Sequence, residues 1–128
     1  MRRYGLFALW LLGILFPLAW LGRYWAFFKR VFDPAFAPEA VHILMHLILF
    51  TGLIVIGSWA FQVSLSRQTI FASLVLVLVV GTLQELFQAW SNGIFLLPPL
   101  VFDLGVDLVG GAAGLIIVSR WRRRKSGV

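Results

Sequence analysis

The sequence lacks cysteine and has few charged residues. Its 128 residues include no Cys, 5 acidic and 11 basic side chains, and charged residues make up 12% of the chain. Without cysteine there are no disulfides, thiolate metal sites or cysteine nucleophiles. Hydrophobic residues make up 61%, compared with about 45–50% in a typical soluble domain. The composition therefore predicts a single membrane domain over residues 1–128.

Four apolar runs predict an all-α bundle of four transmembrane helices. The runs span about residues 4–22, 41–61, 69–90 and 100–118. Each has roughly the 20 residues that a helix needs to cross a bilayer. The first run also resembles a signal peptide, but its length and the bulky aromatic residues behind it favour a retained helix. Ser91-Asn92-Gly93 predicts a turn, and Pro98-Pro99 predicts that the last helix begins only at Leu100.

The distribution of basic residues predicts the orientation. With both termini cytoplasmic, eight basic residues lie inside: Arg2, Arg3, Arg67, Arg120, Arg122, Arg123, Arg124 and Lys125. Three lie outside: Arg23, Lys29 and Arg30. Since Lys and Arg are enriched in cytoplasmic loops, we expect a multi-pass membrane protein with both termini in the cytoplasm. The placement also argues against nucleic acid as a partner and predicts that the basic tail contacts lipid headgroups.

Polar side chains interrupt the last three runs, although an ionised group at a helix centre costs roughly 2.5–3.5 kcal/mol. With the predicted topology and a rise of 1.5 Å per residue, His46, Glu85 and Asp107 lie on the order of 7–12 Å below the outer surface. Polar faces at one depth are more stable together than in lipid, so we predict a pocket that opens outward. The residues in this set are His42, His46, Glu85, Gln88, Asp103 and Asp107.

Small residues follow the two aspartates on the last run. Gly110 and Gly114 continue the helical stripe of Asp103 and Asp107, and Gly111, Ala112 and Ala113 lie between them. Small side chains let two helix backbones approach closely inside a membrane. The segment therefore predicts a helix-packing face formed by Gly110, Gly111 and Gly114.

Three motifs occur in order along the chain: PEAVHILMHLIL, ELFQ and DLGVDLVGGAAG. Over residues 38–118 they resemble the VanZ-like family of small bacterial membrane proteins, named for a teicoplanin-resistance gene product. The resemblance implies a helical protein of the bacterial inner (cytoplasmic) membrane, in the cell envelope, with a role in antibiotic resistance but no defined reaction. It places His42 at the family's histidine and His46 where tyrosine is usual. The chain departs from the pattern at Pro38 and Glu39, which replace an acid and a lysine, and it has no arginine between Gln88 and Asp103.

The polar residues have functional and structural interpretations. The catalytic candidates are Glu85, Asp107 and His42, because carboxylates and imidazoles exchange protons. The binding candidates are His46, Gln88 and Asp103, and the metal candidates are His42, His46 and Glu85. Alternatively, the histidines bond between helices, Glu85 sets helix register, and Asp103 caps a helix. The sequence identifies no cofactor.

Three classes of function fit these residues. The first is a protein that binds or acts on a lipid-linked or glycopeptide-related envelope ligand at the outward pocket, although that pocket has no Lys or Arg for an anionic headgroup. The second is a non-catalytic accessory subunit of a larger membrane complex. The third is a proton-coupled carrier, which at 128 residues would need to oligomerise. The absence of an activated nucleophile argues against covalent catalysis, but whether the chain is an enzyme stays open.

Overall fold

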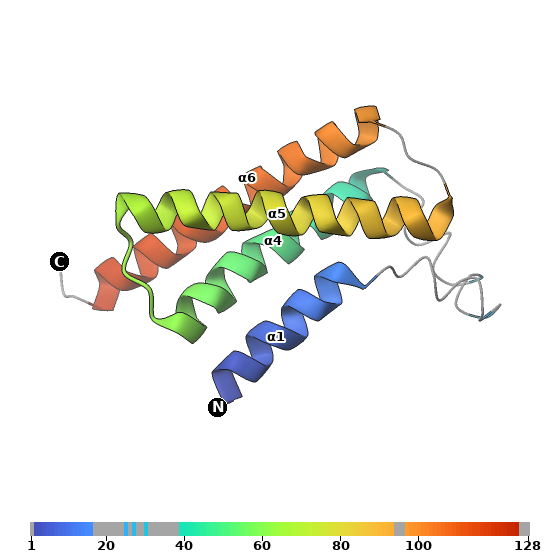
Figure 1. Cartoon of the computed structure of the whole chain (residues 1–128). Helices are drawn as coiled ribbons and strands as arrows, with labels where there is room; N and C mark the ends of the chain where they lie inside the picture. Colours follow the sequence, from blue (N-terminus) through green and yellow to red (C-terminus); the bar gives the residue numbers. More distant parts are fainter. Residues whose placement is uncertain are drawn as a thin grey trace.

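The computed structural model describes residues 2–16, 25, 27, 30, 39–93 and 97–125. Within these residues it contains helices and no strand, so the predicted all-α fold is confirmed. The helices are α1 (Arg2–Leu15), α4 (Glu39–Phe61), α5 (Arg67–Asn92) and α6 (Leu97–Lys125), drawn in Figure 1.

Helices α4, α5 and α6 are each long and apolar enough to cross a membrane. Helix α1 has 14 residues, a length of about 21 Å at the usual helical rise, shorter than a hydrocarbon core of roughly 30 Å. The rest of the first predicted span, residues 17–22, lies outside the described residues. The fold therefore supports a membrane protein with three candidate crossings.

Helices α4 and α6 run parallel to each other, so residues in contact are separated by a nearly constant number of positions in the sequence. His46 contacts Asp107 across 61 residues, and Thr51 contacts Gly110 across 59. Helix α5 connects them and runs antiparallel to both, as Figure 1 shows. The starts of α4 and α6 and the end of α5 therefore lie at one end of the bundle.

Helix α1 packs against α4 in the opposite direction. The Trp10 indole Nε1 donates a hydrogen bond to the Leu49 carbonyl at 2.9 Å. Nearer the start of α1, the ring of Phe7 packs edge-on against Phe61. The first residues of α1 and the last residues of α6 consequently lie at the same end of the bundle, opposite the starts of α4 and α6 (Figure 1).

Apolar residues from three helices form the buried core: Ile14, Phe50, Leu53, Ile54, Val77 and Val80. Large apolar side chains also cover the outside; Phe71, for example, is 70% exposed. Such faces are stable against lipid tails, which are as apolar as the side chains themselves. The outer surface of α4, α5 and α6 therefore fits a lipid bilayer.

Glycines allow α6 to approach its neighbours closely. A Cβ on Gly110 would lie 3.0 Å from the Leu47 carbonyl oxygen, and one on Gly114 would lie 2.9 Å from the Thr51 carbonyl oxygen. Gly111 faces the other way, where a Cβ would lie 2.8 Å from Val77 Cγ2 on α5. The three glycines expected at a packing face thus lie at two interfaces, α4–α6 and α5–α6.

Expected helix boundaries differ from the structure at the end of α5 and at both ends of α6. Ser91 and Asn92 belong to α5, and the turn begins at Gly93, whose φ of 71° is left-handed and whose N–H bonds to the Ala89 carbonyl. Pro98 and Pro99 lie in the first turn of α6, so the prediction that α6 begins only at Leu100 was wrong. Prolines are tolerated there because first-turn N–H groups have no helical acceptor. Helix α6 also continues beyond residue 118, to Lys125.

Candidate functional site

The polar residues lie at the end of the bundle where α4 and α6 begin and α5 ends. His42 and His46 lie near the start of α4, Asp103 and Asp107 lie near the start of α6, and Glu85 lies in the last third of α5. Because α4 and α6 run parallel, an offset of 61 residues places each histidine beside an aspartate. We refer to these five residues as the polar cluster.

The deepest contact in the polar cluster joins His46 and Asp107. His46 Nδ1 lies 2.7 Å from Asp107 Oδ1, and the two residues are 2% and 0% exposed. An ionised carboxylate only accepts hydrogen bonds, so His46 donates its Nδ1–H to Asp107. The other ring nitrogen, Nε2, takes no part in this bond. Removing either partner would leave the other polar group buried without compensation. This pair therefore holds α4 and α6 in one register.

The second histidine–aspartate pair is nearer the surface of the bundle. His42 Nε2 lies 3.2 Å from Asp103 Oδ1, and their side chains are 41% and 10% exposed. The rings of His42 and His46 are neighbours, with centroids 4.5 Å apart. The polar cluster thus extends from a half-exposed histidine to a fully buried aspartate, and His42 is its accessible side.

Glu85 is half-buried and is not hydrogen-bonded to His46. Its Oε1 is buried and accepts no hydrogen bond from the residues that the structure describes. Its charge nevertheless interacts with those of Asp103, His46 and Asp107. A buried acceptor without a donor is costly. Asp107 Oδ2 is also buried without a hydrogen-bond partner among the described residues. Because Asp107 is fully buried and Glu85 only half-buried, Glu85 is the more accessible of these two carboxylates to a ligand.

Gly81 and Gln84 were not among the predicted site residues, yet both border the polar cluster. A Cβ on Gly81 would lie 2.5 Å from Asp107 Oδ2, so only glycine lets α5 cover this carboxylate. Gln84 is 6% exposed, and its Oε1 also has no hydrogen-bond partner among the described residues. The helical spacing of Gly81, Gln84, Glu85 and Gln88 was the signal for this face.

Gln88, a predicted binding residue, is half-buried, and its backbone carbonyl accepts a hydrogen bond from Ser91 Oγ at 2.9 Å. The three side chains that could share a metal ion are His42, His46 and Asp103, each with one ligand atom within 4.8 Å of the others. The sequence suggested Glu85 as the carboxylate of such a set. Among the residues that the structure describes, Asp103 takes that place.

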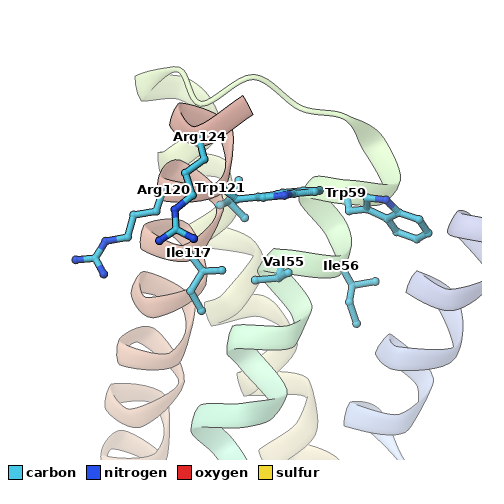
Figure 2. Close-up of a pocket in the computed structure, with 8 residues that line it drawn as sticks. Val55, Ile56, Trp59, Ile117, Arg120, Trp121 and Arg124 are labelled. Atoms are coloured by element: carbon cyan, nitrogen blue, oxygen red, sulfur yellow. The ribbon is translucent and has the colours of Figure 1, made fainter. Parts of the chain in front are cut away.

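A groove between α4 and α6 lies at the opposite end of the bundle. Its walls are apolar, and tryptophan and arginine side chains line it toward the end of α6. Figure 2 shows Trp121 extending from α6 toward α4. The groove is lined by Val55, Ile56, Trp59, Ile117, Val118, Arg120, Trp121 and Arg124. Tryptophan and arginine together are typical of the membrane–water interface.

The polar cluster combines two imidazoles with three carboxylates, whereas α4, α5 and α6 contribute no Lys or Arg at that end. Such a set can exchange protons, hydrogen-bond a polar ligand or hold a cation. It has no fixed positive charge with which to attract an anion.

No protein-family model, no curated protein and no solved structure matches the chain.

Proposed function

We propose that this chain is a VanZ-like protein of the bacterial inner membrane that binds or acts on a lipid-linked or glycopeptide-related envelope ligand at the polar cluster. The observation that carries the proposal is the buried His46–Asp107 pair together with Glu85, whose Oε1 has no hydrogen-bond partner among the described residues. Ionisable residues inside membrane spans are costly, and they usually mark a functional site. The half-exposed His42 is the side from which a ligand enters.

The proposal includes four crossings with both termini in the cytoplasm. The start of α1 and the end of α6, which carries the basic tail of residues 120–125, lie at one end of the bundle. This shared end supports the proposed orientation. The polar cluster then opens to the outside. Reporter fusions at Arg30 and Asn92 should be found outside, and fusions at Arg67 and Gly127 inside. An Arg67 fusion located outside would contradict this topology.

In the proposed site, Glu85 is the acid–base group and the histidine–aspartate pairs position it and the ligand. The ligand has an apolar tail that stays in lipid and a polar head that reaches the polar cluster. His42 and Asp103, at the accessible side, contact the head first. His46 and Asp107 are bonded to each other, so they form the floor of the site.

An accessory subunit is the second candidate, and one observation favours it. Both histidine–aspartate pairs join α4 to α6, which is what a cluster serving only the fold would do. Under this interpretation Glu85 makes no essential contact, since its Oε1 has no partner among the described residues. Replacing Glu85 should then leave any cellular effect of the chain unchanged.

Teicoplanin susceptibility of a bacterium that expresses the chain separates the two candidates. The wild-type chain should lower susceptibility, and Glu85→Gln should abolish the effect while the protein still inserts at normal abundance. Glutamine keeps the shape of glutamate but cannot exchange a proton. Glu39→Gln is the matched control, because Glu39 is exposed in the first turn of α4 and lies outside the polar cluster. Full activity of Glu85→Gln would rule out acid–base chemistry at this residue.

A further inference from the structure

We propose that His42, His46 and Asp103 bind a divalent transition metal, with Zn²⁺ the best fit, and that Asp107 orients His46 toward it. The inference concerns the same end of the bundle as the proposed function. The metal site itself rests on geometry alone, and only the role of the metal toward a ligand rests on the proposed function.

The ligand atoms of the three residues lie close together, and one pair already has the spacing that a metal requires. One atom from each of the three residues lies within 4.8 Å of the others. His42 Nε2 and Asp103 Oδ1 are 3.2 Å apart, close to the edge of about 3.3 Å expected in a tetrahedron with metal–ligand bonds of about 2.0 Å. Neutral imidazoles with a carboxylate form a donor set that zinc accepts. A small movement of the side chains would complete this coordination.

Asp107 provides the outer contact that metal-bound histidines usually have. Such a histidine donates its other ring nitrogen to a carboxylate or carbonyl, which fixes its tautomer and ring orientation. His46 Nδ1 is bonded to Asp107 Oδ1 at 2.7 Å, so its Nε2 is the atom available to a metal. Asp107 is itself fixed, since it is fully buried and its other oxygen lies against Gly81.

The charges at this end of the bundle also favour a cation. Glu85, Asp103 and Asp107 interact electrostatically with one another, and like charges in a medium of low dielectric repel strongly. No Lys or Arg of α4, α5 or α6 lies at this end to offset the repulsion. A divalent cation bound there would offset the charge of the carboxylates.

Three protein ligands leave one coordination position for a water or a ligand, as in catalytic rather than structural zinc sites. Because His42 is the accessible histidine, an incoming group would reach the metal from its side. A phosphate oxygen of an anionic lipid head could bind there. The metal would then supply the positive charge that the side chains of the polar cluster lack.

The experiment uses the full chain, purified in detergent and stripped of metal with a chelator. Titration with Co²⁺ should produce the visible absorption of a tetrahedral site, saturate at one ion per chain and be reversed by Zn²⁺. His42→Asn and Asp103→Asn should each weaken binding at least tenfold, and Asp107→Asn should weaken it by roughly 10–100-fold. Glu39→Gln, on the exposed side of the same helix, should bind like the wild type.

His42→Asn is the most informative variant, because it leaves the His46–Asp107 pair in place and should keep the fold intact. Thermal unfolding of the metal-free proteins checks this. Absence of stoichiometric binding by the wild type would overturn the metal site, and so would wild-type affinity in both His42→Asn and Asp103→Asn. If the wild type binds no metal but Glu85→Gln still abolishes the effect on teicoplanin susceptibility, the metal site alone is refuted. If the wild type binds metal but its expression does not change teicoplanin susceptibility, the proposed function alone is refuted.

Discussion

The same two helices, α4 and α6, place polar residues at both ends of the bundle, but in opposite ways. Where α4 and α6 begin, His46 and Asp107 are buried and bonded to each other. At the other end, Arg120 and Arg124 are exposed beside an apolar groove (Figure 2). Arginine can extend its long stem over apolar surface and keep its charge in water, whereas aspartate is too short to do so. Short polar groups inside a membrane helix must therefore find partners in the bundle.

This comparison predicts that substitutions in the His46–Asp107 pair lower the free energy of unfolding more than substitutions elsewhere in the molecule. His46→Ala should lower the free energy of unfolding by roughly 3–5 kcal/mol, because it leaves a buried carboxylate unpaired. Thermal or denaturant unfolding in detergent measures the effect. Replacing both residues with leucine should be less damaging than His46→Ala, since no charge is then stranded. A double variant as unstable as the single one would contradict this account.

Substitutions of Gly110 and Gly114, where α6 lies close to α4, should have the next largest effect on stability. Gly114→Ala places a Cβ 2.9 Å from the Thr51 carbonyl oxygen and 2.8 Å from Ile54 Cβ. Such overpacking typically costs about 1–3 kcal/mol, and the same unfolding assay measures it. Gly105→Ala is the matched control on α6, because no atom of another described segment lies within 4 Å of its added Cβ. Equal stabilities for the two variants would show that close approach does not hold α6 to α4.

His42→Asn tests the difference between the two pairs within the polar cluster. The His42 side chain is 41% exposed, so its contact with Asp103 is solvated and should contribute no more than about 1 kcal/mol. The loss of stability in the metal-free protein should be several-fold smaller than in His46→Ala. Unfolding curves of both variants under one condition give the ratio. Similar losses would mean that His42 is as important to the fold as His46.

The double variant Arg120→Gln, Arg124→Gln should have the smallest effect on folding. Both side chains are exposed, and surface substitutions usually change stability by less than roughly 0.5 kcal/mol. In bilayers, however, each arginine near an anionic surface contributes on the order of 1 kcal/mol. Unfolding should therefore match the wild type in detergent, and the variant should lose the stabilisation that anionic lipids give over zwitterionic lipids. An unchanged response to anionic lipid would exclude headgroup contact by this pair.

Local features of the sequence were sufficient to predict the helices and the faces of their polar residues. Long apolar runs form helices in a membrane because every backbone group must be bonded internally. Spacings of three and four residues then place His42 with His46, and Asp103 with Asp107, on common faces. The exceptions were helix boundaries, above all the start of α6, where Pro98 and Pro99 occupy a first turn that tolerates proline. The prediction used the rule that proline breaks a helix, which holds in helix interiors but not in the first turn.

Only the tertiary structure decided which polar residues pair. The sequence suggested Glu85 as a metal ligand and left the partner of His46 open, whereas His46 bonds Asp107, and Asp103 lies with both histidines. The choice depends on the register of α4 against α6 and on the rotation of α5, which leaves Glu85 half-buried. Both follow from close contacts at Gly81, Gly110 and Gly114. Such contacts join residues far apart in the sequence, as Gly81 with Asp107 and Gly110 with Leu47, and helical periodicity carries no information over those distances.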